Sequence, residues 1–449
     1  TAVEFRNPAW DLLMRREPRT VGGAVDGRTL HTLDKVDAIV SAVAALDHSY
    51  LAVQGPPGTG KTYVASRVIE KLVREKNYRI GVVAQSHAVV DNVLDRVIEA
   101  GVPKELVGKS SPTAVDDAAF TRVVKRKMGD FVEKNSARGF VVGGTAWDFA
   151  NAGRLARGSL DLLVIDEAGQ FSLASTIACS VVANRLLLLG DPQQLPQVSQ
   201  GTHPEPVDTS ALGWLMDDTD VLAPEFGFFL ERSWRMHPAV AAAVSRLSYD
   251  GKLQAHESAA ARSIEGVEAG IHPVPVPHRG NTSHSAQEAA EVLRIVENLL
   301  GRQWHPGEGL PPRPLTPADI IVVTPYNAQQ QTVSEALAAY PEVRVGTVDK
   351  FQGQEAAVSI TSLAASTARD APRGLEFLLL ENRINVAVSR AQCAAYVIYS
   401  PWLLDDLPYT PAGVRRLSAF ARLMRVGEGE ALAGSRRGNP PATETTLVD

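Results

Sequence analysis

Short, unbroken runs of apolar residues alternate along the first half of the chain with longer stretches in which apolar residues recur every three or four positions. The run at 50–53 is typical of a buried strand, and the stretch at 63–74 has the spacing of a helix. Further strands are predicted at 79–85, 140–143, 160–165 and 185–189, and further helices at 30–46 and 88–100. Strands that alternate with helices predict an α/β fold in which helices cover both faces of a parallel sheet.

The second half repeats this alternation, so we expect two tandem α/β domains with parallel sheets flanked by helices. Strands are predicted at 228–230, 319–324, 343–347, 357–362 and 395–400, and helices at 238–247, 286–300, 328–339 and 382–390. A polar stretch rich in Gly and Asp at 198–221 separates the two blocks, which places the domains at 31–222 and 223–426.

Other segments break the alternation. Residues 1–30 are polar, and because the chain begins at Thr1 without a methionine we expect them to be the remnant of an upstream domain. Residues 101–139 are rich in charge and carry no strand signal, which predicts a small helical insertion in the first domain. The Pro-rich stretch 301–317 predicts a surface loop, and the composition of the tail 427–449 predicts a disordered end.

Residues 54–62 read QGPPGTGKT and lie between the predicted strand 50–53 and the predicted helix 63–74. Glycines in this loop permit backbone angles that turn successive N–H groups toward one anion, and the helix adds the positive end of its dipole. Lys61 is placed to reach the β- and γ-phosphates of a nucleotide, and the Thr62 hydroxyl to ligate Mg²⁺. The complete motif in this context predicts a nucleoside triphosphate site rather than an incidental glycine-rich turn.

Two acidic residues, Asp166 and Glu167, follow the predicted strand 160–165. At the carboxyl end of a buried strand they are expected in the crevice where open α/β sheets bind ligands. Asp166 would hold Mg²⁺, and Glu167 would orient and deprotonate the attacking water. Two acids at a strand end are equally typical of a capped helix start, but downstream of a phosphate loop they favour hydrolysis.

The predicted strand 185–189 runs into the sequence GDPQQLP at 190–196. A glutamine on a loop beside the γ-phosphate can form a hydrogen bond with phosphate or water, which makes Gln194 a candidate sensor of hydrolysis. A polar turn is the alternative, since Asp-Pro is ordinary turn chemistry.

Composition restricts the partners of the chain. The net charge is −6 and the pI about 6.0, so any binding to nucleic acid must rely on local groups. Cys179 and Cys393 lie far apart within apolar runs, which predicts buried thiols in a reducing cytoplasm. No apolar run reaches membrane-spanning length, and we expect no membrane partner.

Together these motifs resemble those of superfamily 1B helicases, which move 5′ to 3′, in the group of the nonsense-mediated-decay RNA helicase and the DNA-replication helicases. The chain is also similar to the helicase part of bacterial RecB-like nuclease–helicase fusions. The matching segments are 55–62, 84–92 (AQSHAVVDN), 143–145 (GGT), 166–170 (DEAGQ), 190–196, 231–238 (ERSWRMHP), 324–326 (TPY), 346–355 (GTVDKFQGQE) and 385–391 (NVAVSRA). The resemblance implies two tandem RecA-like P-loop domains with ATP between them.

The resemblance also implies a role in ATP hydrolysis for individual residues. The first domain would supply Lys61, Thr62, Asp166, Glu167 and Gln194, and the second domain would supply two arginine fingers, Arg235 and Arg390. Further nucleotide contacts are implied for Gly55, Pro56, Pro57, Gly58, Thr59, Gly60, Trp234 and Glu355.

Two positions of the nucleotide site depart from the family pattern. Lys35 stands where an adenine-reading glutamine is usual, and Trp234 stands where a base-stacking tyrosine is common. An indole stacks at least as well as a phenol. We therefore expect ATP as the nucleotide, with weaker selection among bases.

Contacts to a nucleic-acid strand are implied for Ser86, His87, Thr145, Pro325, Tyr326 and Thr347. Hydroxyl and backbone N–H groups hold phosphates without reading sequence, and aromatic rings stack on any base. Trp147 is either such a ring or a core residue, and the basic run 125–127 is either a phosphate clamp or a solvated face. The histidines at 272, 278 and 284 fit no compact zinc pattern and are expected at the surface.

The chain is therefore expected to hydrolyse ATP with Mg²⁺ and to act as a 5′-to-3′ translocase or helicase on single-stranded nucleic acid. Only a short segment separates Tyr326 from Val343, which leaves no room for the second-domain insertion of 3′-to-5′ relatives. The expected partner is a strand with a 5′ overhang, DNA rather than RNA, with a nuclease fused upstream or acting in trans, and the chain is expected to be a cytoplasmic monomer. Two alternatives stay open: an ATPase that remodels protein–nucleic acid complexes without processive unwinding, and a nucleotide-gated scaffold for a nuclease.

Overall fold

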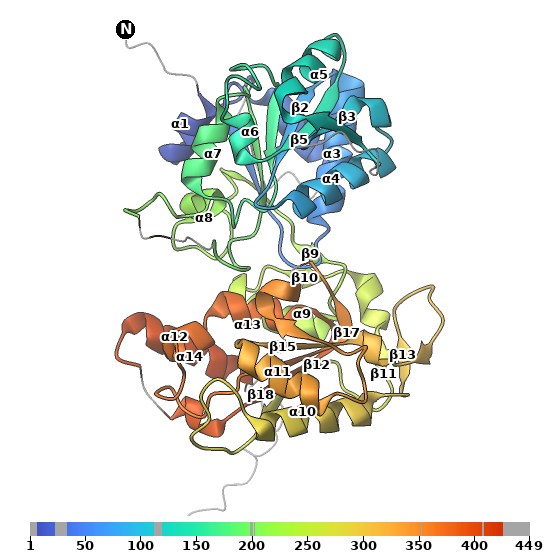
Figure 1. Ribbon diagram of the computed structural model, residues 1–449, viewed down its shortest axis with the longest axis vertical. Coiled ribbons are helices and arrows are strands. Elements are labelled where there is room, and N and C mark those ends of the chain that lie inside the picture. Colours follow the sequence, from blue (N-terminus) through green and yellow to red (C-terminus); the bar gives the residue numbers. More distant parts are fainter. Residues whose placement is uncertain are drawn as a thin grey trace, which may run out of the picture. The chain divides into compact units, whose positions relative to one another are not determined.

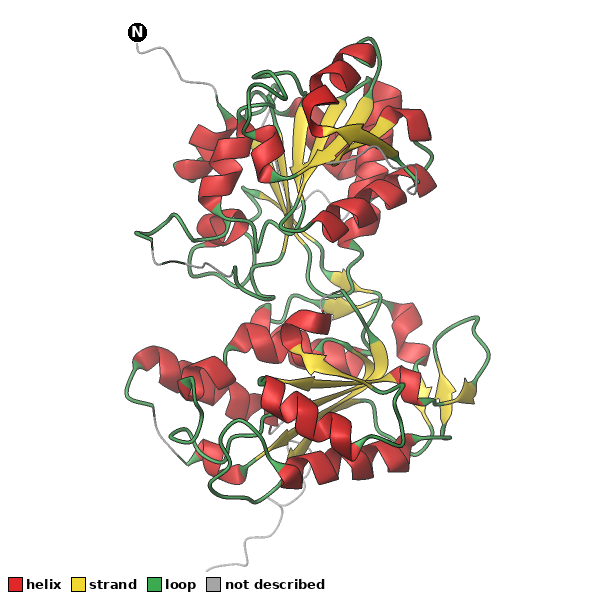
Figure 2. Ribbon diagram, in the orientation of Figure 1, coloured by secondary structure: helices red, strands yellow, loops and turns green. Residues whose placement is uncertain are grey.

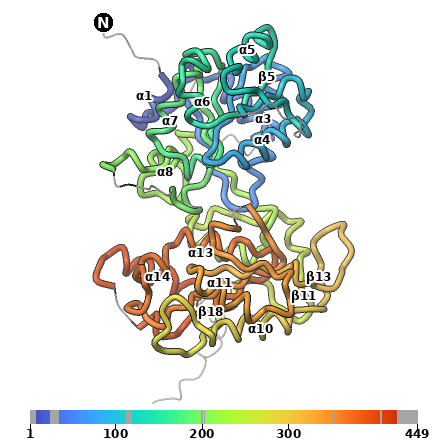
Figure 3. Tube along the Cα trace, viewed as in Figure 1, coloured from blue at the N-terminus to red at the C-terminus, as the bar shows by residue number. Residues whose placement is uncertain are grey.

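The computed structural model describes residues 7–22, 34–111, 119–197, 201, 203–351, 353–405 and 408–424. The predicted tail 427–449 and Gln352 of the 346–355 motif lie outside the described residues. The chain divides into two compact units: the first holds Thr1–Arg235 and Ser248–His256, and the second holds Met236–Leu247 and Glu257–Asp449. The chain thus passes into the second unit, returns once, and then stays in the second unit (Figure 3).

The first unit is built on an eight-stranded sheet in the order β4-β3-β5-β2-β6-β7-β1-β8, and all of its strand pairs are parallel. Its strands are β1 (Tyr50–Gln54), β2 (Arg79–Val83), β3 (Val107–Ser111), β4 (Thr121–Val124), β5 (Phe140–Gly144), β6 (Leu162–Ile165), β7 (Leu186–Gly190) and β8 (Gly227–Phe229). A short parallel pair, β9 (Arg232–Ser233) and β10 (Gln254–Ala255), follows.

Helices cover both faces of this sheet (Figure 1, Figure 2). They are α1 (Pro8–Leu13), α2 (Lys35–Ala45), α3 (Lys61–Lys76), α4 (His87–Glu99), α5 (Met128–Lys134), α6 (Ala146–Phe149), α7 (Leu173–Ser180) and α8 (Ala211–Met216). Side chains of β1 alternate between two cores: Leu51 and Val53 pack with α2, α3 and α4, whereas Tyr50 and Ala52 pack with α1, α7 and α8. Because both faces are buried, the strands read as continuous apolar runs.

Two expectations for the first unit are wrong. The segment 101–139 is not simply a helical insertion, because β3 and β4 within it extend the sheet beside β5. The short strand β3 reads VGKSS, which has no apolar run to reveal it, although all five of its residues are buried. The strand predicted at 228–230 belongs to the first unit rather than the second, since β8 pairs with β1.

The second unit holds a five-stranded parallel sheet in the order β12-β18-β17-β15-β16. Its strands are β12 (Gly270–Pro275), β15 (Ile320–Thr324), β16 (Arg344–Thr347), β17 (Ala356–Ser362) and β18 (Ala391–Tyr399). Its helices are α9 (Pro238–Ser248), α10 (Ala286–Leu299), α11 (Asn327–Ala336), α12 (Gly374–Leu378), α13 (Glu381–Val388) and α14 (Pro411–Met424). Helices α10 and α11 pack on one face of the sheet, and the predicted α/β class of parallel sheets flanked by helices is confirmed.

The sequence pattern misses two strand regions of the second unit. Strand β12 carries Pro273 and Pro275, which argue against a central strand, but β12 is an edge strand and proline is tolerated there. The stretch predicted as a surface loop at 301–317 contains β13 (Gln303–His305) and β14 (Arg313–Pro314), which form a small antiparallel sheet with β11 (Ser263–Ile264).

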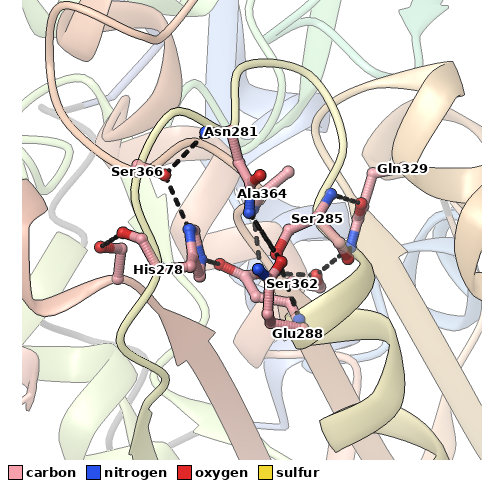
Figure 4. Close-up of polar contacts among 10 residues, drawn as sticks. His278, Asn281, Ser285, Glu288, Gln329, Ser362, Ala364 and Ser366 are labelled. Carbon is pink, nitrogen blue, oxygen red and sulfur yellow. Dashed lines mark hydrogen bonds and ion pairs between the residues drawn. The ribbon is translucent and has the colours of Figure 1, made fainter.

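A buried polar network ties α10, α11 and the end of β17 together (Figure 4). The two ring nitrogens of His278 lie 2.7 Å from Ser366 Oγ and 2.9 Å from Glu288 Oε1. The other Glu288 oxygen accepts hydrogen bonds from Ser362 Oγ at 2.7 Å and from the Ala364 N–H at 2.9 Å. The expectation of a surface histidine is therefore wrong at His278, whose side chain is fully buried, because its polar partners come from distant parts of the chain.

Among the described residues, no helix combines the length and the apolar character needed to cross a membrane.

Candidate functional site

The loop between β1 and α3 has the backbone geometry that its glycines predict. Gly58 and Gly60 have φ of 74° and 79°, in the left-handed region that favours glycine. The loop is held by the Thr59 hydroxyl, which donates to Pro56 O at 2.8 Å, and by Lys61 Nζ, which donates to Gly55 O at 2.7 Å. The loop and the N-terminus of α3 therefore form a compact turn of backbone amides with one ammonium group across it.

Asp166 and Glu167 follow β6, which is separated from the phosphate-loop strand β1 by one strand, β7. Glu167 has φ of 55°, an uncommon value for a residue with a side chain. Burial and the negative charge of Glu167 raise the pKa of Asp166 to about 7, and the positive charge of Lys61 opposes this rise. The structure thus brings the two carboxylates and the loop lysine within electrostatic range of one another.

Gln194 lies in the turn after β7, where its amide is held by a buried carboxylate. Its Nε2 donates to Asp191 Oδ2 at 2.9 Å, and the phenol of Tyr249 donates to the same oxygen at 2.7 Å. The other Asp191 oxygen accepts from Gln54 Nε2 at 3.3 Å, at the end of β1. Burial raises the pKa of Asp191, and the positive charge of Lys61 is the first influence that lowers it again.

A cavity of about 690 Å³ lies beside the phosphate loop within the first unit, and its walls include Lys35, Gly58, Glu231 and Trp234. The Trp234 ring stacks on the ring of His256, with centroids 3.5 Å apart, and is 53% exposed. Burial lowers the pKa of the Lys35 ammonium, whereas the nearby charge of Glu231 raises it. The structure therefore places Lys35 and Trp234 in one cavity, of the volume typical for a small-molecule ligand.

Arg235 is the last residue of the first unit before the chain enters the second unit. Its chain segment is bonded to the phosphate loop: the Trp234 N–H donates to Gly58 O at 2.8 Å, and Ser233 Oγ donates to Pro57 O at 3.0 Å. A Cβ on Gly58 would lie 2.4 Å from Arg235 Cβ, so only glycine fits at this approach.

Arg390 lies in the second unit, directly after α13, and is buried. Its guanidinium donates to Gln354 O at 3.2 Å. Glu355, which follows Gln354, accepts a hydrogen bond from Gln392 Nε2 at 2.8 Å. The two residues implied by resemblance, Arg390 and Glu355, therefore lie together where β17 and β18 begin.

The implied nucleic-acid residues of the first unit follow β2 and β5, which are neighbours in the sheet. Ser86 and His87 are exposed at the start of α4, and Thr145 begins α6 in a capping box with Asp148. Trp147, in the first turn of α6, is 82% exposed, which excludes the core alternative. The sequence pattern missed Lys109 of β3, a buried cation that donates to His87 O at 3.0 Å and pairs with Asp91.

The implied nucleic-acid residues of the second unit lie at the ends of neighbouring strands. Pro325 and Tyr326 follow β15, and Thr347 ends β16. Tyr326 is only 9% exposed, and its ring packs 6.0 Å from that of Phe377. A contact between Tyr326 and a ligand would therefore use its backbone or its hydroxyl rather than an open ring face.

Comparisons with known proteins also divide the chain into two consecutive domains, and their boundary near residue 208 precedes the end of the first unit's long segment at Arg235. Residues 36–209 match one AAA domain family and residues 208–401 match another. The chain is 26% identical to a regulator of nonsense transcripts 1 homolog of Neurospora crassa over 421 residues, which cover 82% of this chain and 37% of that protein. It is 26% identical to the DNA replication ATP-dependent helicase/nuclease JHS1 of Arabidopsis thaliana, with 84% of this chain and 29% of that protein covered.

A solved structure of an arterivirus nonstructural protein 10, a helicase in complex with DNA, covers 79% of this chain and 61% of its own with 18% identity and a TM-score of 0.42. The chain spans 37% and 29% of the lengths of the two curated relatives. The two consecutive AAA domain matches and the helicase relatives agree with the order of the motifs, and over most of its length the chain is similar to ATP-dependent helicases.

Proposed function

We propose that this chain is an ATP-dependent translocase or helicase that moves 5′ to 3′ along single-stranded nucleic acid. The observation that carries the proposal is the electrostatic proximity of Lys61 to both Asp166 and Asp191. The strands that precede these two residues, β6 and β7, lie next to the phosphate-loop strand on one side, in the order β6-β7-β1. A phosphate cradle, a carboxylate pair and a held glutamine are the parts that nucleotide hydrolysis needs. A scaffold that only bound nucleotide would need the cradle alone.

In this proposal each group of the first unit has one task. The loop amides and Lys61 bind the triphosphate, and Glu167 accepts a proton from the attacking water. Gln194, fixed at 2.9 Å to Asp191, orients the water or the γ-phosphate. Arg235 and Arg390 are proposed to stabilise charge on the transferred phosphoryl group, as the family resemblance implies.

The residues present fit a Mg²⁺ ion held by Thr62 and Asp166. Mg²⁺ prefers hard oxygen ligands, and these side chains offer a hydroxyl and a carboxylate. A buried Asp166 whose pKa is raised to about 7 is also a site where a cation would stabilise the charged form. When bound, the ion would neutralise phosphate charge.

The nucleotide is proposed to be ATP with relaxed selection among bases. Lys35 in the cavity offers only hydrogen-bond donors, whereas a glutamine would offer both a donor and an acceptor to the adenine edge. Glu231 in the same cavity wall supplies an acceptor, so the purine edge of GTP also finds complementary groups.

The polymer is proposed to be single-stranded DNA in preference to RNA, and Trp147 to be a ring on which a base stacks. The Trp147 indole is 82% exposed and lies near the ends of β2 and β5, which Ser86 and Thr145 follow, and this exposure supports the contact. The helicase/nuclease relative supports the DNA preference and a nuclease acting upstream or in trans, and the regulator of nonsense transcripts leaves RNA as the competing substrate. We propose a monomer that works in the cytoplasm, where the buried thiols of Cys179 and Cys393 stay reduced.

Two assays test the proposal. ATP hydrolysis is measured with no polymer and with single-stranded DNA or RNA of equal length, and DNA is expected to stimulate it more. Strand displacement is then measured on duplexes with a 5′ or a 3′ overhang, and only the 5′ overhang is expected to support unwinding. Stimulated hydrolysis without displacement from either duplex would favour an ATPase that remodels complexes.

A further inference from the structure

Two arginines of the second unit share one aromatic ring. The guanidinium carbon of Arg373 lies 4.0 Å from the centroid of the Phe377 ring, and that of Arg383 lies 4.2 Å from the same centroid. The two cations therefore lie no further apart than the sum of these distances. Arg373 is exposed and precedes α12, whereas Arg383 is half-buried in α13.

Within the part of the chain that the structure describes, neither Arg373 nor Arg383 forms an ion pair with an acidic side chain. The Nε of Arg383 is buried, and it has no hydrogen-bond partner among the described residues. Burial lowers the pKa of Arg383, Asp349 raises it by its charge, and Arg373 lowers it. Two like charges thus lie within electrostatic range of each other, and the one on Arg383, which is partly removed from water, also feels the carboxylate of Asp349.

Tyr326 completes the cluster. Its ring lies 6.0 Å from that of Phe377, and its hydroxyl is buried with no hydrogen-bond partner in the part of the chain that the structure describes. Burial raises the pKa of Tyr326, and the charges of Arg373 and Arg383 lower it, so the phenol oxygen is within range of both cations. Tyr326 is 9% exposed, and its hydroxyl, which has no partner among the described residues, keeps an unused capacity to form a hydrogen bond.

The chemistry of a ligand for this cluster follows from these donors. Two guanidiniums and one phenol offer donors and positive charge, so the complementary ligand is an anion rich in acceptor oxygens. The planar fork of arginine matches the oxygens of a phosphate, and stacking on Phe377 fixes the plane of each fork in advance. Tyr326, with Pro325, follows β15, where the family resemblance implies a contact with the nucleic-acid strand.

We propose that Arg373 and Arg383, stacked on Phe377 and next to Tyr326, bind a backbone phosphate of the single strand. The inference rests on the proposed nucleic-acid function and adds a binding site to it. Because a phosphate is shared by DNA and RNA, this site adds affinity for both and selects neither.

The test compares Arg373→Ala with Arg369→Ala. Both changes remove one positive charge from the loop between β17 and α12, but only Arg373 stacks on Phe377. Binding of fluorescein-labelled oligo(dT) and oligo(U) is measured by anisotropy over a range of salt concentrations, and the Michaelis constant for ATP is measured without polymer. We expect Arg373→Ala to weaken binding of both oligonucleotides about tenfold at low salt and to reduce the salt slope by about 0.7, the value for one phosphate of a single strand.

Arg369→Ala is expected to keep the salt slope and affinity close to those of the unmodified protein. Equal losses in the two variants would overturn the site, because the effect would then be that of net charge. An unchanged affinity in Arg373→Ala would also overturn it, and so would a higher Michaelis constant for ATP with unchanged strand binding, which would assign the arginine to the nucleotide. If the unmodified protein bound neither oligonucleotide, the proposed nucleic-acid function itself would fail. This outcome differs from the variant results that would overturn only the Arg373 site.

Discussion

The phenol of Tyr249 donates a 2.7 Å hydrogen bond to the carboxylate of Asp191, and the same oxygen accepts from Gln194 at 2.9 Å. Tyr249 is fully buried, in the segment Ser248–His256 that returns to the first unit directly after α9. Tyr249, on this returning segment, thus fixes the Asp191 carboxylate, which in turn holds Gln194 of the proposed hydrolysis site.

Tyr249→Phe is expected to lower kcat for ATP about tenfold with little change in the Michaelis constant. The reason is that the Asp191 oxygen that accepts from Gln194 loses its other donor. One hydrogen bond to a charged group is worth about 1.5–3 kcal/mol. Steady-state hydrolysis checks this. Tyr50→Phe is the matched control, since Tyr50 is also fully buried and its hydroxyl donates to Arg16 O at 2.6 Å. Equal effects of the two substitutions on kcat would show that Tyr249 only stabilises the fold.

Lys61→Ala is expected to abolish tight binding of ATP, because the variant loses the one ammonium group that lies across the phosphate loop. A titration with a fluorescent ATP analogue measures the affinity. Lys71→Ala is a suitable control, since Lys71 lies in the same helix, α3, and pairs at the surface with Asp37. Retention of tight binding by Lys61→Ala would remove the phosphate-loop assignment.

Asp166→Asn is expected to change how stability depends on pH. The pKa of Asp166 is raised from 3.8 to about 7 in the folded chain, so between these values the folded state binds more protons than the unfolded state. The free energy of unfolding therefore falls as pH rises through this window, and the fall is complete above pH 7.

The asparagine variant lacks this titration, so its stability relative to the unmodified protein should increase from pH 4 to pH 8. Urea unfolding at the two pH values, without nucleotide, measures the difference. Asp130→Asn, at an exposed position of α5, should show no such change. A parallel pH dependence in the unmodified protein and Asp166→Asn would contradict the raised pKa.

Glu288→Ala is expected to destabilise the second unit by about 2–5 kcal/mol, because several buried polar groups each lose a hydrogen-bond partner at a cost of about 1–3 kcal/mol. Glu288 is fully buried and holds His278, Ser362 and the Ala364 N–H (Figure 4). Glu291→Ala on the same helix removes only the partner of the exposed Arg294 and should cost less than about 1 kcal/mol. Denaturant unfolding compares the two variants, and similar midpoints would show that the buried network contributes little.

What the sequence could predict was local. The phosphate loop, the carboxylates after β6 and the turn with Gln194 each lie within a few residues of a strong apolar run, and each occurs at the predicted strand end. Their identity needs no knowledge of distant segments. The strands that precede these motifs, β1, β6 and β7, could be predicted equally well, because burial on both faces makes them continuous apolar runs.

The partners that complete the site could not be predicted from the sequence, because folding brings them together over long sequence separations. Tyr249 meets Asp191 and His278 meets Ser366 across separations of 58 and 88 residues. Strand β3 was missed because its sequence, VGKSS, has no apolar run, although its lysine is buried and paired with Asp91. The contact between the Arg235 segment and the phosphate loop was also missed, because hydrogen bonds to Gly58 and Pro57, rather than an apolar pattern, hold this segment there.

Hydrolysis by Glu167→Gln tests the central claim most directly. Phosphate release is measured for this variant and for the unmodified protein, each with and without single-stranded DNA, alongside binding of ATP and DNA. We expect the DNA to stimulate the unmodified protein, and the variant to bind both ligands normally while turning over about 10²–10⁴ times more slowly, the usual contribution of a general base. Near-normal turnover by the variant, or a rate in the unmodified protein that does not respond to single-stranded nucleic acid, would contradict the account.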